Sequence, residues 1–190
     1  MPHHSRMSQA PILYDFDVAL SHVDRALDER LSVRTARHPS ETLDRVWLRL
    51  FAYCLFREER LVFGKGLSDP DQPDLEERDL TGQLSLWIRC GKADPERVQK
   101  VVDQNGRSRV AVVFESPRRM EDFIAAARAQ KLNRLARAEL VAVDPALTAQ
   151  LAEVESRRAK LSLTIVGDHL YVERDGKSLD GPLTRGSAAL

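Results

Sequence analysis

The sequence predicts an α/β (α+β) protein with a mixed central β-sheet flanked by helices and a β-hairpin at each end of the chain. In the middle of the chain, short apolar segments alternate with segments whose apolar residues recur at helical spacing, an order typical of strands joined by helices. At both ends, two alternating apolar-polar segments follow each other directly, which favours hairpins. The 190 residues, 43% of them hydrophobic, suffice for one domain with a sizeable core.

The first hairpin is expected at residues 12–20 and 31–37, where ILYDFDVAL and LSVRTAR alternate and SHVDRALDER connects them. The next segment, ARHPSETLDRVWLRLFAYCLFREER, predicts a helix. Pro39 suits its first turn, where a missing N–H costs no hydrogen bond. Asp44, Arg45 and Arg49 are expected on its polar face. The apolar positions at helical spacing are Leu43, Val46, Trp47, Leu50 and Cys54.

The middle of the chain predicts the central strands. RLVFGKGLSDPDQPDLEERDLTGQ begins as a short strand and continues as an acidic loop rich in Gly, Pro and Asp. The strand LSLWIRCG follows, then a helix at about residues 94–102 and the strand RVAVVFE. Because RVAVVFE is apolar almost throughout, it is expected near the sheet centre with both faces covered. LSLWIRCG is expected to pair with LVF.

The last third begins with a helix in SPRRMEDFIAAARAQ, where Ser116 suits the N-cap and Pro117 the first helical position. The strand ARAELVAVD, a short helix in PALTAQLAEVESRRAK and a hairpin in LSLTIVGDHLYVER complete the predicted fold. We therefore expect a disordered N-terminal tail at residues 1–10, one domain at residues 11–176, and a partly ordered C-terminal tail at residues 177–190.

Composition excludes several classes of function. Lys plus Arg equals Asp plus Glu at 29 each, so no overall field attracts nucleic acid or an anionic membrane. The only two cysteines, Cys54 and Cys90, form no disulfide framework or zinc pattern, and a reducing cytoplasm is the simplest setting. No apolar run approaches the length of a membrane span.

Three charged residues could form one site. Glu41 lies in the expected first turn of the first helix, Asp74 follows Pro73 in the acidic loop, and Arg89 ends a strand. In a metal-dependent phosphodiesterase, two or three carboxylates bind a divalent cation that activates water. A helix Glu and a Pro-Asp pair are present here, but the strand acid is absent. Lys100, with Arg97 on the same helical face, could replace the lysine that such sites often use.

Each of these residues also has a structural interpretation. Glu41 could complement the helix dipole or close a cap at His38. Asp74 could form an Asx-turn in a solvated loop. Lys100 and Arg97 could simply be exposed.

The runs TARHPSETLDRVWLRLFAYCL, LVFGKGLSDPDQPDLEERDLTGQLSLWI and DPERVQK resemble the YaeQ family of bacterial proteins, with ARHPSET as the most specific string. Beyond Gly106 the resemblance rests mainly on the order of elements. It implies a fold similar to the PD-(D/E)XK nucleases, with Glu41 as the helix acid and Pro73-Asp74 as the Pro-Asp motif. The family's strand reads like IDLWIEVG, and here it reads LSLWIRCG.

Ser85 and Arg89 therefore replace the two strand acids of the family, and Glu76 replaces a tryptophan. This departure predicts a catalytically degenerate site, composed of Glu41, Asp74, Arg89 and Lys100, with a binding or regulatory role and no cofactor. One alternative is a divalent-metal nuclease acting on DNA or RNA, with Glu41 and Asp74 holding Mg²⁺ or Mn²⁺. Another is a protein-interaction domain. The expected partners are nucleic acid or a protein, not a membrane.

Arg89 itself is expected to occupy the place of the nuclease cation. A guanidinium within about 4 Å of Asp74 or Glu41 would neutralise two acids that otherwise repel each other. The alternative is that Arg89 extends from the strand end into water.

A basic segment is a second candidate for binding. Arg107, Arg109, Arg118 and Arg119 lie around the strand RVAVVFE and could meet phosphates. No aromatic residues interleave them as a stacking platform would require.

Overall fold

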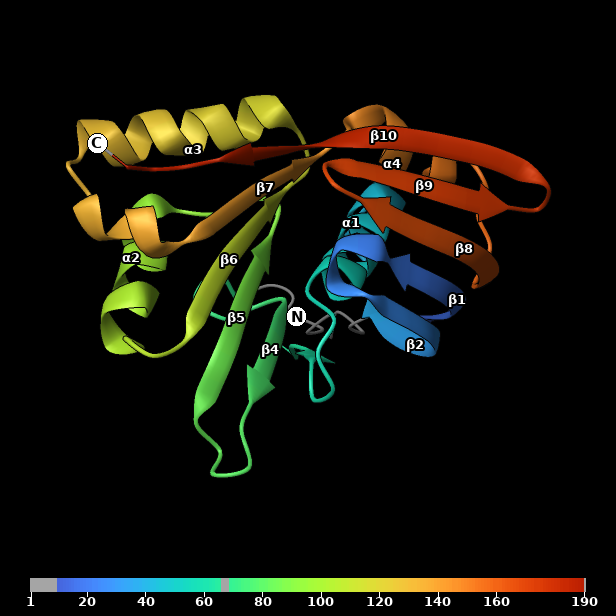
Figure 1. Cartoon of the computed structure of the whole chain (residues 1–190), viewed down its shortest axis with the longest axis horizontal. Helices are drawn as coiled ribbons and strands as arrows, with labels where there is room; N and C mark the ends of the chain where they lie inside the picture. The colour runs from blue at the N-terminus through green and yellow to red at the C-terminus, as the bar shows by residue number, and fades with distance from the viewer. Residues whose placement is uncertain (1–9, 66–68, 190) are drawn as a thin grey trace, which may run out of the picture.

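The computed structural model describes residues 10–65 and 69–189 (Figure 1). The N-terminal tail expected at residues 1–10 lies outside this part of the chain except for Ala10. Within the described residues there are four α-helices, α1 Leu43–Leu55, α2 Pro95–Gln104, α3 Pro117–Ala129 and α4 Pro145–Ala152, and two short 3₁₀ helices, η1 Val23–Arg25 and η2 Asn133–Arg137. None of these helices is long and apolar enough to cross a membrane.

The strands form one mixed sheet of ten members across the described residues, in the order β2-β1-β8-β9-β10-β7-β6-β5-β4-β3. Neighbours β1 and β8 are parallel, as are β5, β6 and β7, and the other pairs are antiparallel. The strands are β1 Ile12–His22, β2 Leu27–Arg37, β3 Val62–Phe63, β4 Leu75–Arg78, β5 Leu84–Cys90, β6 Arg109–Phe114, β7 Glu139–Val143, β8 Arg158–Val166, β9 His169–Arg174 and β10 Lys177–Gly186. The mixed sheet and both terminal hairpins confirm the predicted class.

Two hydrophobic cores lie on opposite faces of the parallel strands. Leu86, Ile88 and Cys90 of β5 belong to the core that contains α1, while Trp87 belongs to the core that contains α2 and α3. Strand β6 alternates in the same way and is buried from Val110 to Phe114. Because both faces of these strands are covered, their sequences read as continuous apolar runs.

The first helix begins later than predicted. The expected start was near Pro39, but α1 begins at Leu43 with Thr42 as its N-cap. The residues before it form a turn in which the Glu41 N–H donates to the His38 carbonyl at 2.8 Å. Glu41 therefore lies just before the helix rather than in its first turn.

The acidic loop contains a strand that the sequence did not predict. Strand β4 lies between β3 and β5, so β5 pairs with β4 and not with the LVF segment, contrary to the prediction. Leu75, fully buried, is its one apolar anchor. A four-residue strand with one apolar residue carries too little periodicity to be distinguished from a loop.

The C-terminal segment also differs from its prediction. Residues 177–190 were expected to form a partly ordered tail, yet β10 occupies residues 177–186. Its first part, 177–182, pairs with β9 and its last part, 183–186, pairs with β7 (Figure 1). Strand β10 thus joins the β2-β1-β8-β9 strands to the β7-to-β3 strands in one sheet.

Candidate functional site

A cluster of charged side chains lies between the start of α1 and the carboxyl end of β5. Glu41 precedes α1, and Arg45 and Arg49 follow it one and two turns along the helix. The four-residue spacing of Arg45 and Arg49 puts both on one face of α1, the face that Glu41 contacts. Asp74 precedes β4 and Arg89 lies near the end of β5. The fold therefore brings together the sequence-predicted residues Glu41, Asp74 and Arg89.

Two arginines hold the Glu41 carboxylate. Arg49 donates through Nε to Oε1 at 2.8 Å and through Nη2 to Oε2 at 2.9 Å. Arg45 donates through Nη1 to Oε1 at 2.8 Å, and the backbone N–H of His38 donates to Oε2 at 3.3 Å. The predicted hydrogen bond between Glu41 and the His38 backbone is therefore present, but His38 is not a helix cap, because α1 begins at Leu43, and the arginines are the closer partners.

Asp74 is buried and fully engaged. Its Oδ1 accepts from Nη2 of Arg45 at 2.7 Å, and its Oδ2 accepts from the backbone N–H of Cys90 at 2.6 Å. The Asp74 side chain thus ties the segment before β4 to the end of β5. The alternative that placed Asp74 in a solvated loop is wrong, because the side chain is almost entirely buried.

Arg89 lies at the edge of this cluster. Its Nε is 3.8 Å from Oδ2 of Asp74, within ion-pair range but longer than the contacts of Arg45. The guanidinium instead donates to three backbone carbonyls, those of Lys92 at 3.1 Å, Gln72 at 3.0 Å and Asp69 at 3.2 Å. Arg89 is thus one cation beside Asp74, while Arg45 provides the direct bridge between the two carboxylates.

The arginine pattern was missed in sequence because Arg45 and Arg49 were assigned to the polar face of the helix. Arg49 is 0% exposed and also donates to Oγ1 of Thr35 at 2.6 Å. The available signal was the spacing of Glu41, Arg45 and Arg49, which places one acid in reach of two cations.

The electrostatics of the cluster follow from burial and pairing. Burial by itself lowers the pKa of the Arg45 guanidinium, but the charge and hydrogen bonds of Asp74 and the hydrogen bond of Glu41 outweigh it and raise that pKa. Arg45, Arg49 and Arg89 face two carboxylates, which leaves one net positive charge if all five are ionised. The same surroundings do not suit a free thiolate, since burial raises the pKa of the Cys90 thiol well above its ordinary value.

This donor set does not fit a metal ion. A divalent cation needs several oxygen ligands, and within residues 10–65 and 69–189 no three His, Cys, Asp or Glu side chains come together as such a group. All four oxygens of Glu41 and Asp74 already accept from arginine or backbone donors. Arg45 therefore occupies the space between the two acids that a metal would need.

Lys100 does not join the cluster. It lies exposed on α2, on the other face of the sheet from α1. Its neighbour on the helix, Arg97, forms an ion pair with Asp71 at 3.4 Å.

The four arginines proposed as a basic patch do not form one surface. Arg107 lies just before β6 and Arg109 begins it, whereas Arg118 and Arg119 lie in the first turn of α3, beyond the other end of that strand. Six residues of strand separate the pairs by about 20 Å. Arg109 is also neutralised by two hydrogen bonds of 3.0 Å to Glu139.

A cleft of about 580 Å³ adjoins the charge cluster on the side of Arg45. It lies where β5, β6 and β7 end, and open sheets of parallel strands commonly bind ligands at this edge. Arg45 reaches it with 24% of its side chain exposed. The lining residues are Thr42, Asp44, Arg45, Leu48, Gly91, Lys92, Glu115, Ser116, Arg119, Pro145 and Thr148.

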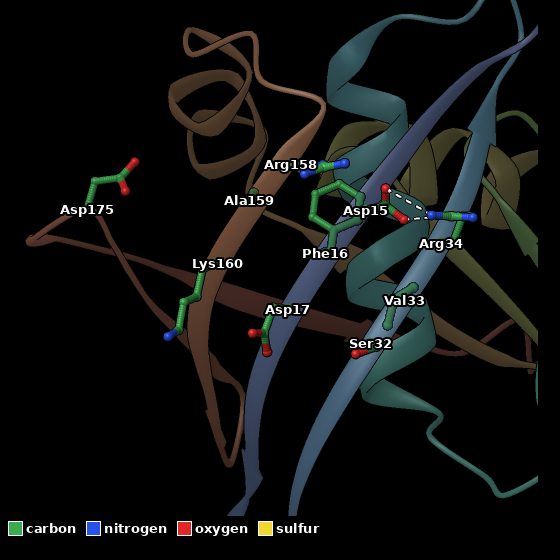
Figure 2. A pocket seen from close by; sticks show the side chains of 10 residues that line it. All are labelled: Asp15, Phe16, Asp17, Ser32, Val33, Arg34, Arg158, Ala159, Lys160 and Asp175. Carbon is green, nitrogen blue, oxygen red and sulfur yellow. Dashed lines mark hydrogen bonds and ion pairs between the residues drawn. The ribbon is translucent and has the colours of Figure 1, made fainter.

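A wider hollow of about 730 Å³ lies on the outer face of β1, β2 and β8, and Figure 2 shows its side chains. Acids on β1 alternate there with bases on the neighbouring strands. Asp15 accepts from Nε of Arg34 at 2.6 Å, and Asp17 lies opposite Lys160 in the β1-β8 register. Such cross-strand pairs are typical of a solvated sheet face.

The fold and the site together define a class, a mixed α+β protein in which arginine bridges two buried carboxylates beside the carboxyl ends of parallel strands. A profile of the family described as YaeQ protein matches residues 7–181. The chain belongs to the YaeQ family.

Relatives support this assignment over most of the chain. The uncharacterized protein YaeQ of Salmonella typhi is 33% identical over 161 residues, covering 85% of this chain and 86% of that protein. The uncharacterized protein YaeQ of Escherichia coli (strain K12) is 28% identical over 178 residues, covering 94% and 97%.

Two solved structures have the same fold. The crystal structure of YaeQ protein from Xanthomonas axonopodis pv. citri superposes with a TM-score of 0.83 at 30% identity, covering 95% of this chain and 100% of that one. YaeQ protein from Pseudomonas syringae gives a TM-score of 0.80 at 28% identity, covering 95% and 99%.

Proposed function

We propose that this chain is a catalytically degenerate relative of the PD-(D/E)XK nucleases that binds nucleic acid through phosphate contacts and without a metal ion. The observation that carries the proposal is Arg45, whose two terminal nitrogens lie 2.8 Å from Glu41 and 2.7 Å from Asp74. In a nuclease the two acids would hold a cation that neutralises the scissile phosphate. Here a guanidinium occupies the place of that cation.

Loss of the metal removes the chemistry but not the attraction for phosphate. An arginine cannot lower the pKa of a bound water as a metal ion does, so the site has no means of generating hydroxide at neutral pH. The guanidinium remains charged at any physiological pH and suits phosphate oxygens. With three arginines facing two acids, the cluster keeps an excess positive charge that favours an anionic ligand.

Two measurements on the purified protein test the proposal. The first incubates it with labelled DNA and RNA in the presence of Mg²⁺ or Mn²⁺, and no metal-dependent cleavage is expected. Cleavage that needs the metal and disappears in Asp74→Ala would overturn the proposal in favour of an active nuclease.

The second measurement is fluorescence anisotropy with short single-stranded DNA and RNA over a salt series. The dissociation constant should rise steeply with salt, with a slope in log–log form of about 0.7 per phosphate contacted. Binding should not change when EDTA is added. The control variant Arg34→Gln should bind as tightly as the wild type, since it removes an arginine from the outer sheet face, distant from the cleft. No binding at low salt would refute the proposal and favour the hypothesis of a protein-interaction domain.

A further inference from the structure

The geometry points to the cleft at the ends of β5, β6 and β7 as a binding site for a sugar phosphate monoester, with the phosphate on its basic wall and a sugar hydroxyl above Gly91. This inference rests on the proposed function in one respect, because Arg45 belongs to both. It adds a ligand class that the charge cluster alone does not specify. The volume of about 580 Å³ lies within the range of about 300–1,000 Å³ usual for small-molecule sites.

The position of the cleft follows from the sheet. Strands β5, β6 and β7 are parallel neighbours, so their carboxyl ends meet at one edge (Figure 1). Gly91 and Lys92 follow β5, Glu115 and Ser116 follow β6, and Pro145 begins the helix after β7. Residues from three consecutive strand-to-helix connections thus line one hollow.

The basic wall can hold a phosphate. Lys92 and Arg119 line the cleft beside Arg45. Arg119 is 69% exposed, and within the described residues it forms one ion pair, with Glu115 at 3.3 Å. The N-terminus of α1 opens at the same place, and its cap residue Thr42 makes no side-chain capping hydrogen bond. A helix N-terminus with uncapped N–H groups favours an anion, and Asp44 in the first turn, which also lines the cleft, offsets part of this attraction.

Two polar atoms without partners face the position above Gly91. Oε2 of Glu115 is itself buried and has no hydrogen-bond partner among the described residues, while the rest of that side chain is 42% exposed. Nε of Arg45 donates to none of the described residues, because the contacts of that guanidinium all use Nη1 and Nη2. A Cβ placed on Gly91 would stand 3.6 Å from Oε2 of Glu115 and 3.7 Å from Nε of Arg45.

These two atoms select a hydroxyl group. A hydroxyl can accept from Nε of Arg45 and donate to Oε2 of Glu115 at once. Inorganic phosphate also carries an O–H, but placed here its negative charge would be repelled by Glu115, which a neutral sugar hydroxyl avoids. A buried acceptor without a donor is unfavourable, so a ligand that supplies both groups gains over one that supplies the phosphate alone. The sugar phosphate can be free or can form the 5′ end of an RNA strand, where the 2′-hydroxyl of the terminal ribose is still present.

Calorimetric titrations with ribose 5-phosphate, inorganic phosphate and ribose test the ligand class. Ribose 5-phosphate should bind about tenfold more tightly than inorganic phosphate, which is the gain expected of one hydrogen bond to a charged group. Glu115→Leu, which removes the acceptor, should abolish this advantage without weakening the binding of inorganic phosphate. Arg119→Gln should weaken both phosphates about tenfold. Arg118→Gln, next to it on α3 but outside the cleft, should have no effect.

RNA oligonucleotides of one sequence with and without a 5′-phosphate separate the two sources and the two proposals. Tighter binding of the 5′-phosphorylated strand, lost in Arg119→Gln, assigns the cleft to strand ends. If ribose 5-phosphate binds and neither strand does, the sugar phosphate site is supported and the proposal that nucleic acid is the partner is wrong. If both strands bind equally and with salt dependence while ribose 5-phosphate does not bind, the assignment of the cleft as a sugar phosphate site is wrong, and the proposed function still holds.

Discussion

Replacing Arg49 by methionine should strongly destabilise the protein. The side chain is 0% exposed and makes two hydrogen bonds to Glu41, one to Thr35 and one to the carbonyl of Ala36. Methionine preserves most of the volume, but it leaves the buried Glu41 carboxylate with only Arg45 and one backbone donor. Removing one partner of a buried ion pair costs about 3–5 kcal/mol.

Urea unfolding followed by circular dichroism measures this change in the free energy of unfolding. The loss corresponds to a melting temperature lower by roughly 6–20 °C for a chain of this size. The double variant Glu41→Leu/Arg49→Met should recover most of the loss, because it removes the uncompensated charge together with its partner. Arg34→Met, which removes an exposed arginine from the outer face of the sheet, should change little. An Arg49→Met protein that unfolds at the same urea concentration as Arg34→Met would show that the buried network contributes nothing to stability.

Three further predictions follow from the same contacts. The double variant Arg45→Gln/Arg89→Glu should bind Mn²⁺ more tightly in calorimetry than the wild type. Arg89→Glu alone should not, since Arg45 still fills the space between the acids. Equal Mn²⁺ affinities of the double variant and the wild type would mean that arginine does not exclude the metal. Burial raises the pKa of the Cys54 thiol from 9.0 to about 12. The stability that this group contributes is therefore complete below pH 9 and is lost as the pH rises towards 12. A Cys54→Ala variant whose free energy of unfolding depends on pH as in the wild type would contradict this. Deleting residues 177–190 should abolish cooperative unfolding, because β10 bridges β9 and β7; a truncated protein that still unfolds in one sharp transition would contradict the role assigned to β10.

The sequence by itself determined the class of the fold and most of its helices. The continuous apolar run of RVAVVFE identified a strand covered on both faces, and β6 is buried from Val110 to Phe114. The Ser116-Pro117 pair located the start of α3, where the Ser116 side chain caps the N–H of Arg119. These features are local, because a periodic pattern or a cap depends on residues a few positions apart.

Only part of the charge cluster could be predicted from the sequence. Glu41, Asp74 and Arg89 could be named as neighbours from the resemblance to a known pattern, but the position of Arg45 and Arg49 could not. An arginine on the polar side of a helix is normally exposed. Whether it is instead buried against an acid depends on what the tertiary fold places beside it, in this case Asp74 from a segment 29 residues further along the chain.

Only the tertiary structure settled the pairing of the weakest strands and the location of the cleft. Strand β4 has one apolar residue and β10 lies in a polar segment, so neither carries a periodic signal strong enough to predict. Both are held by hydrogen bonds to neighbours on either side, which fix a strand whatever its side chains. The cleft likewise requires the ends of three parallel strands and the start of α1 to meet. Their proximity depends on the order of the strands in the sheet, which sequence periodicity does not determine.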